Sequence, residues 1–135
     1  SPLMFSADSG RTNIISHLIA QGANINEQDQ RGRTPLTFAA ASNHVQTMEF
    51  LLNRGADING GHASASAAAF GASAAAAAQM VTTPLIEAVT GNNMAAVDLL
   101  TSRGADLTLM DSEGRTALTT AIYLGYDHLA SFLVD

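Results

Sequence analysis

The chain has 135 residues, with 12 acidic and 6 basic side chains, no cysteine and a formal net charge of -6. Without cysteine it has neither a disulfide framework nor a thiolate metal site, and it lacks the clustered basic residues that nucleic-acid binding requires. The longest weakly apolar run, 74–78, is far too short to cross a bilayer, and no basic segment followed by an apolar stretch opens the chain. We therefore expect an intracellular protein, cytoplasmic or nuclear, with no nucleic-acid partner and no membrane insertion.

A spacing of 33 residues recurs along the chain. It separates Pro2 from Pro35, Gly22 from Gly55, and Pro84 from Ala117. A fixed period of this length is typical of a solenoid, in which each unit packs only on its neighbours.

The first residues of each repeat predict a short helix. A Ser or Thr side chain at the first place can accept a hydrogen bond from a free backbone N–H, and proline at the second place already has a helical φ. A Gly or Asn at the tenth place enters the left-handed conformation at low cost, so it ends the helix after about two turns. The first places are Ser1, Thr34, Thr83 and Thr116, the second are Pro2, Pro35, Pro84 and Ala117, and the tenth are Gly10, Asn43, Asn92 and Gly125.

A second apolar stretch at helical spacing follows in every repeat, as in segment 48–52. In three repeats a Gly-Ala pair then ends this helix, starting at Gly22, Gly55 and Gly104. Helices this short are marginal alone in water, so their stability must come from packing on neighbouring repeats.

The period and the sequence GRTPLTFAA at 32–40 resemble the ankyrin repeat, with its T-P-L-H-x-A motif. The resemblance implies an all-α solenoid of about four stacked helix-turn-helix units with β-hairpin-like fingers, and a curved stack with a concave face. The histidine of the motif is replaced here, so we expect the inter-repeat hydrogen bonds of that histidine to be absent. The residues at its place are Met4, Thr37, Ile86 and Thr119.

The period fails once, between Pro35 and Pro84, where a tract rich in Ala, Ser and Gly is inserted. Its composition favours a mobile loop, although alanine is the best helix former and 74–80 could make a short helix. The predicted organisation is repeat 1 at 1–33 with a truncated start, repeat 2 at 34–59, the insertion at 60–82, repeat 3 at 83–115, and repeat 4 at 116–135 with a truncated end.

Residues for catalysis do not form a recognisable pattern. The four histidines stand at unrelated places in the repeats, and no pair has the spacing of a zinc-binding helix. Nucleophile-elbow, phosphate-loop and dinucleotide-binding motifs are also absent. We therefore expect no enzyme activity, no cofactor and no metal site. The histidines are His17, His44, His62 and His128.

The resemblance places the fifth, eighth and ninth residues of each first helix, together with the finger residues before each repeat, along the concave face. Phe5 and Phe38 would then lie side by side with Arg31 and Arg33 nearby, and these residue types dominate binding hot spots. Alternatively, both phenylalanines turn inward and fill the space between repeats. The other candidate contacts are Ala41, Ser42, Glu87, Thr90, Arg115 and Tyr123.

Asn59, with Asn26 at the equivalent place, resembles the context that ankyrin repeats offer to an oxygen-dependent asparaginyl hydroxylase. A cap of the finger turn explains the same asparagine without an enzyme.

Our leading hypothesis is a monomeric, non-catalytic scaffold that binds another protein or peptide segment on the concave face and finger tips. The alternatives are a regulatory segment that docks on an enzyme, channel or kinase domain of the same larger chain, and a mechanical spacer.

Overall fold

A computed structural model describes residues 2–29, 32–59, 82–107, 109–110 and 114–134. The described residues form helices and no strand, which confirms the all-α prediction. The helices come in consecutive pairs: α1 (Pro2–Asp8) and α2 (Thr12–Ala20), α3 (Pro35–Ala41) and α4 (Val45–Asn53), α7 (Pro84–Thr90) and α8 (Met94–Ser102), and α9 (Ala117–Leu124) and α10 (Asp127–Val134).

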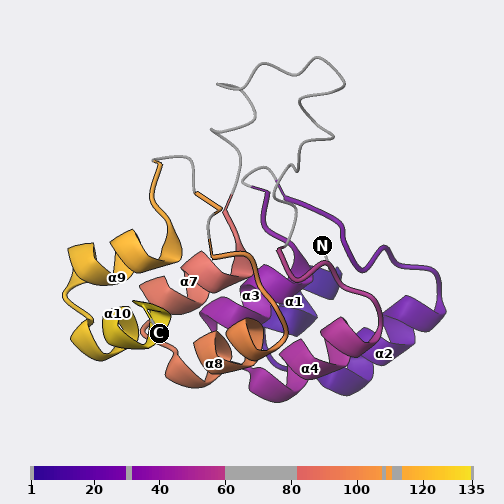
Figure 1. Ribbon diagram of the computed structural model, residues 1–135. Coiled ribbons are helices and arrows are strands. Elements are labelled where there is room, and N and C mark those ends of the chain that lie inside the picture. Colours follow the sequence, from indigo (N-terminus) through magenta and orange to yellow (C-terminus); the bar gives the residue numbers. More distant parts are fainter. Residues whose placement is uncertain (1, 30–31, 60–81, 108, 111–113, 135) are drawn as a thin grey trace, which may run out of the picture.

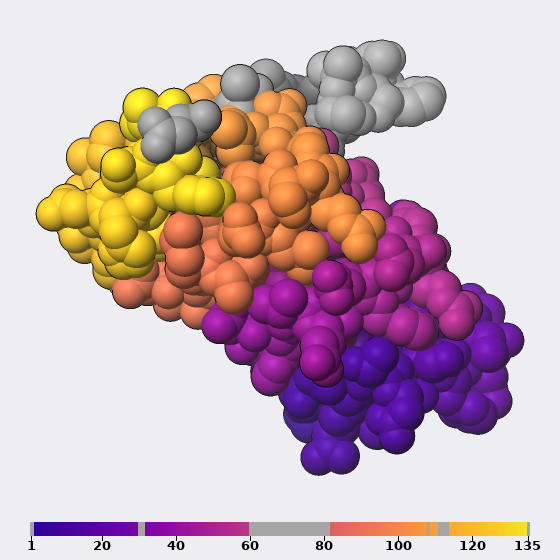
Figure 2. Space-filling view, turned by 60° about the horizontal axis from the view of Figure 1, so that its bottom comes forward, coloured from indigo at the N-terminus to yellow at the C-terminus, as the bar shows by residue number. Residues whose placement is uncertain are grey.

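The pairs stack in sequence order. Helix α3 packs between α1 and α7, and α9 packs on the far side of α7, so the first helices of the pairs form one row. Helices α2, α4 and α8 form a second row beside it (Figure 1). Figure 2 shows the repeats following one another from the indigo end to the yellow end of an elongated molecule.

Local chemistry sets the start of each first helix. Proline is the first residue of α1, α3 and α7, as the repeat register predicts. The side chains of Thr34, Thr83 and Thr116 cap α3, α7 and α9 by accepting a backbone N–H from the third helical residue. These caps satisfy donors that have no partner inside the helix.

The ends of the first helices also follow the prediction. Asn43 and Asn92 have φ values of 58° and 57°, and they are the non-glycine residues with positive φ in the described part of the chain. Asparagine tolerates this conformation better than most residues because its short polar side chain can hydrogen-bond locally. The left-handed residue lets the backbone turn sharply into the second helix.

The core runs continuously along the stack and is built from both rows. Small residues of the first helices, including Ala39, Ala40 and Ala88, have no exposed surface, which allows close helix contact. The larger side chains of the second helices fill the remaining space. Fully buried examples are Ile15, Met48, Leu51, Val97, Leu100 and Leu129.

The two ends of the stack expose positions that are buried inside it. Ile122 is 62% exposed, whereas Ala40 and Val89, at the same place in the inner repeats, are 0% exposed. At the other end Ile14 is 38% exposed, whereas the equivalent Thr47 is 2% exposed. Exposure of an apolar side chain at an end is therefore explained by the lack of a neighbouring helix pair in the described structure.

The predicted insertion at 60–82 lies outside the described residues except for Thr82, which is buried beside α7. The alternatives of a mobile loop and a short helix at 74–80 stay predictions.

Candidate functional site

The fifth and eighth residues of the first helices lie along one side of the stack, which we call the first-helix face. Residues three apart in a helix lie on the same side, so each first helix contributes a pair of side chains. The four eighth residues are all exposed, which makes the first-helix face continuous along the stack. The pairs are Phe5 and Asp8, Phe38 and Ala41, Glu87 and Thr90, and Thr120 and Tyr123.

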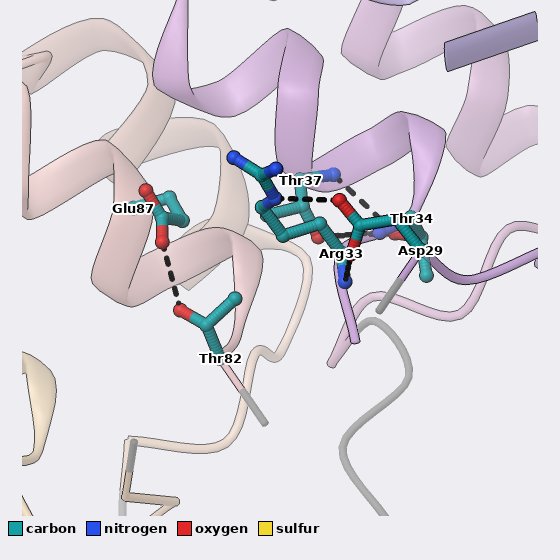
Figure 3. A network of polar contacts seen from close by, with 6 residues as sticks. All are labelled: Asp29, Arg33, Thr34, Thr37, Thr82 and Glu87. Atoms are coloured by element: carbon teal, nitrogen blue, oxygen red, sulfur yellow. Dashed lines mark hydrogen bonds and ion pairs between the residues drawn. The ribbon is translucent and has the colours of Figure 1, made fainter. Parts of the chain in front are cut away.

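Arg33 is held over Phe38 by the finger that precedes α3. Its Nε donates to Asp29 Oδ2 at 2.7 Å, and its backbone N–H donates to Asp29 Oδ1 at 2.9 Å (Figure 3). The guanidinium carbon lies 4.7 Å from the centre of the Phe38 ring. The ring is partly buried against the core, so Phe38 packs inward and also carries a cation on its outer surface.

The neighbouring repeat has a carboxylate, Glu87, at the place of the Phe38 ring. Glu87 stands in α7 where Phe38 stands in α3, and its Oε1 accepts the Thr82 hydroxyl at 3.0 Å (Figure 3). The other carboxylate oxygen makes no hydrogen bond or ion pair with any described residue. Glu87 is half-buried at the first-helix face.

An arginine and an aromatic ring meet again at α9. The guanidinium of Arg115 lies 4.9 Å from the centre of the Tyr123 ring, and Tyr123 is 74% exposed. The first-helix face therefore alternates in charge along the stack, with Arg33 on Phe38, then Glu87, then Arg115 on Tyr123.

The remaining predicted contact residues have other roles in the structure. Phe5 is 68% exposed at the end of the stack, whereas Thr120, at the same place in the last repeat, is 4% exposed. The carbonyl of Ala41 accepts Asn93 Nδ2 at 2.9 Å, and the hydroxyl of Ser42 donates to Asp8 at 2.7 Å, so both residues join neighbouring repeats. Arg31 lies outside the described residues.

The sequence comparison with known families agrees with this architecture. Residues 1–62 match the family described as "Ankyrin repeats (3 copies)". Residues 1–62 are thus a segment of the ankyrin-repeat family. The helix pairs at 84–102 and 117–134 continue the same stack beyond the matched segment.

Two curated proteins are similar to parts of this chain. A 55-residue segment is 40% identical to a protein named L-asparaginase from Dirofilaria immitis, over 41% of this chain and 9% of that protein. A 59-residue segment is 32% identical to alpha-latrocrustotoxin-Lt1a from Latrodectus tredecimguttatus, over 43% of this chain and 4% of the toxin. The chain thus spans less than a tenth of either relative.

The two asparagines at the ankyrin fingers connect successive repeats. Asn26 Oδ1 accepts the backbone N–H of Asp57 at 2.8 Å, and Asn59 Oδ1 accepts that of Asp106 at 2.9 Å. These bonds supply a structural reason for both asparagines, and hydroxylation of either stays a prediction. Intact-mass measurement on protein purified from source cells, for a gain of one oxygen, tests it.

Two sets of polar contacts in the stack were missed by the sequence reasoning. Thr37 and Thr119, which replace the usual histidine, complete capping boxes with Thr34 and Thr116. The Thr-x-x-Thr spacing was a visible signal for them, because a polar side chain at the third helical position can return a bond to the cap.

The second set joins neighbouring helix pairs at the corner between the two helices of a pair. His44 Nε2 donates to the backbone carbonyl of Asp8 at 2.9 Å, and Asn93, at the same place one repeat later, donates to the carbonyls of Ala40 and Ala41. These bonds depend on how adjacent repeats are placed, so a single repeat gives no signal for them.

Among the residues that the structure describes, no group of three or more His, Asp or Glu side chains is arranged to hold a metal ion. Among the same residues, no helix combines the length and apolar character that crossing a bilayer demands.

Proposed function

We propose that this chain is a non-catalytic binding segment that holds part of another protein against the first-helix face and the adjoining fingers. Ankyrin repeats are generally protein-protein interaction modules, and this gives the class of function. The observation that carries the choice of face is the Arg33–Phe38 pair, which is fixed by Asp29 and lies on the first-helix face.

The chemistry of this pair suits recognition. An arginine oriented by a carboxylate has lost part of its rotamer freedom before binding, so less entropy is lost when a partner pairs with it. Its Nη atoms make no hydrogen bond with the described residues, and they present a planar pair of donors to a partner carboxylate. The aromatic ring beneath supplies apolar area at low conformational cost.

A pull-down with a matched control tests the proposal. The double variant Phe38→Ala and Arg33→Ala removes the pair from the first-helix face. The control double variant, Phe50→Ala and Arg54→Ala, removes a similar pair at α4, in which the Arg54 guanidinium carbon lies 4.9 Å from the centre of the Phe50 ring. We expect the first double variant to lose partners captured from the source organism and the second to retain them. Unchanged capture by the first double variant, with its helical circular dichroism intact, would refute the choice of face.

A second candidate is a regulatory segment that packs on another domain of the same larger chain. The similarity to 9% of a protein named L-asparaginase favours it, because that protein carries the related segment within a much longer chain. The complete parent sequence distinguishes the two, since an adjacent catalytic domain favours the regulatory function. On either hypothesis, a monomeric state and an intracellular location stay predictions.

A further inference from the structure

The two ends of the stack expose apolar side chains at places that neighbouring repeats cover inside it. The fourteenth place is exposed in the first repeat, where Ile14 is 38% exposed, and is at most 2% exposed in the later repeats. The seventh place is exposed in the last repeat, where Ile122 is 62% exposed, and is 0% exposed in the earlier ones. A repeat that ends a stack in water needs a polar outer surface, and neither end has one at these places. The buried residues are Thr47, Ala96 and Leu129 at the fourteenth place, and Ala7, Ala40 and Val89 at the seventh.

The residue before each second helix shows what the first end is shaped to meet. His44 Nε2 donates to the Asp8 carbonyl of the preceding repeat at 2.9 Å. One repeat later, Asn93 Nδ2 donates to the Ala41 carbonyl at 2.9 Å. Arg11 has this place in the first repeat, and its φ of -90° and ψ of 77° are close to the -88° and 79° of His44. The Arg11 guanidinium can therefore donate to carbonyls at the end of a first helix that packs on this end.

The last repeat presents matching groups at the other end. Tyr123 corresponds to Asp8, and its carbonyl accepts no hydrogen bond from any described residue. A Cβ at Gly125 would meet no atom within 4 Å, whereas a Cβ at the corresponding Gly10 would lie 2.9 Å from the His44 ring. Gly125 thus leaves open the room that the His44 ring fills inside the stack.

Opposite charges also stand at the two ends. Arg11 in the first repeat and Asp127 in the last are exposed, and neither side chain forms a hydrogen bond or ion pair with a residue that the structure describes. Gly10 and Thr12 of the first repeat line one cleft with residues 43–47 of the second. The twelfth place of one repeat and the eleventh place of the next therefore border the same cleft. Asp127 is at the twelfth place and Arg11 is at the eleventh, so packing of these two ends would bring the charges together.

We propose that the last helix pair of one copy of this chain packs on the first helix pair of a second copy, head to tail, and continues the stack across two chains. The contact covers Ile122 of one copy and Ile14 of the other. Arg11 of the second copy donates to the Tyr123 carbonyl and pairs with Asp127 of the first. This contact uses the ends of the stack and is independent of the proposed binding at the first-helix face.

The geometry also determines how the copies assemble. The two contacting surfaces differ, so the contact is heterologous and can add further copies in a row. One helix pair against another is a small interface, and small interfaces are weak. Each chain carries a net charge of -6, which opposes association until salt screens the repulsion. The chain should therefore be a monomer when dilute and associate when concentrated.

Sedimentation velocity of the 135-residue chain, from micromolar to millimolar protein, tests the contact at about 0.15 M salt, where charges more than about 8 Å apart are largely screened. We expect the weight-average sedimentation coefficient to rise with concentration. Ile14→Glu and Ile122→Glu should each weaken the association roughly tenfold or more, because each places an unpaired charge in the contact. Leu107→Glu, at an exposed apolar site in the finger after α8, should associate like the unmodified chain.

Mixing the two glutamate variants tests that the contact is head to tail. The Ile14→Glu chain keeps an unaltered last helix pair, and the Ile122→Glu chain keeps an unaltered first one. An equimolar mixture should therefore form dimers with the strength of the unmodified contact and nothing larger. Circular dichroism checks that each variant is folded, and a serine variant at the same place replaces any glutamate variant that is not.

A charge exchange tests whether Arg11 and Asp127 meet. Arg11→Glu and Asp127→Arg should each weaken the association roughly threefold, because an exposed ion pair is replaced by two like charges. Both substitutions in one chain should restore most of the association, because every contact again joins opposite charges. A double variant as weak as the single ones would overturn the pairing of these two residues.

Three results would overturn the inference as a whole. The first is a chain that stays monomeric at every concentration. The second is association of either glutamate variant alone at the unmodified strength, which would indicate a symmetric contact or another surface. The third is a mixture of the two variants that forms no dimer. Each of these results would leave the proposed function in place, because neither Ile14 nor Ile122 belongs to the first-helix face.

Discussion

Replacement of Thr34 by alanine gives a quantitative test of how the repeats are stabilised. Thr34 is 1% exposed, and its hydroxyl accepts the Thr37 backbone N–H at 3.3 Å. The Thr37 hydroxyl accepts the Thr34 backbone N–H at 3.1 Å and also contacts the Thr34 hydroxyl at 3.1 Å. Thr34→Ala removes the cap and leaves a buried Thr37 group without its partner, so we expect a loss of about 2–3 kcal/mol in the free energy of unfolding.

The chain contains its own control for this prediction. Thr116 and Thr119 form the same capping box at α9, but there the contacts are exposed to solvent. Water replaces a lost partner at an exposed site, so Thr116→Ala should cost about 0.5–1 kcal/mol. Thr34→Ser keeps the hydroxyl and should lie within about 0.5 kcal/mol of the unmodified chain.

Urea unfolding followed by circular dichroism measures all three variants under the same conditions. The expected order of destabilisation is Thr34→Ala, then Thr116→Ala, then Thr34→Ser. An equal loss for the two alanine variants would refute the argument that burial of the capping box, rather than the cap alone, sets its contribution.

Three further predictions concern the corner, the core and the fingers. Alanine at Gly10 would place its Cβ 2.9 Å from His44 Nδ1 at a φ of +71°, whereas the Cβ of alanine at Gly55 would meet no atom within 4 Å at a φ of +95°. Thermal unfolding should therefore show a larger loss of stability for Gly10→Ala than for Gly55→Ala. Adding His44→Ala to the Gly10→Ala variant should reduce this difference. Leu100→Ala should lower the free energy of unfolding by about 2–5 kcal/mol because it leaves a cavity at a fully buried site. Ile122→Ala, at an exposed site, should change it by less than about 0.5 kcal/mol. Similar urea midpoints for the two variants would contradict the burial pattern. Asn26→Ala should cost about 0.5–1.5 kcal/mol by removing the acceptor of the Asp57 N–H, and hydrogen exchange at Asp57 should accelerate; unchanged exchange would disprove that the asparagine joins the fingers.

Local sequence chemistry was sufficient to predict the helices. Threonine before proline specifies a helix start, and Asn43 or Asn92 specifies its end, because each effect depends on the residue's own backbone preferences. The 33-residue period then places these starts in equivalent layers. The prediction of stacked helix pairs succeeded because the helix signals recur at equivalent places in the repeats, although the period fails once and Ala117 replaces the proline of the last repeat.

The orientation of Phe38 could not be decided from the sequence. The alternatives were an outward contact residue and an inward filler, and the structure gives Phe38 both properties, with one side against the core and Arg33 over the ring. This arrangement depends on the finger that brings Asp29 and Arg33 together, and finger geometry is not encoded in helix periodicity.

Replacement of the motif histidine has a further effect besides the expected loss of its inter-repeat hydrogen bonds. Thr37 and Thr119 contribute capping bonds within their own repeats, whereas His44 and Asn93 connect adjacent repeats at another place. Inter-repeat contacts depend on residues far apart in the sequence, so they became visible only when the repeats were placed beside each other.

Site-specific photo-crosslinking tests the central claim most directly. A photoreactive amino acid at Thr90 lies on the first-helix face, and the same amino acid at Asp98 lies at an exposed position of α8 as a control. Expressed in source cells, the Thr90 version should form covalent adducts with partner protein that the Asp98 version does not form. Adducts confined to Asp98, or equal at both positions, would contradict the claim that partners bind the first-helix face.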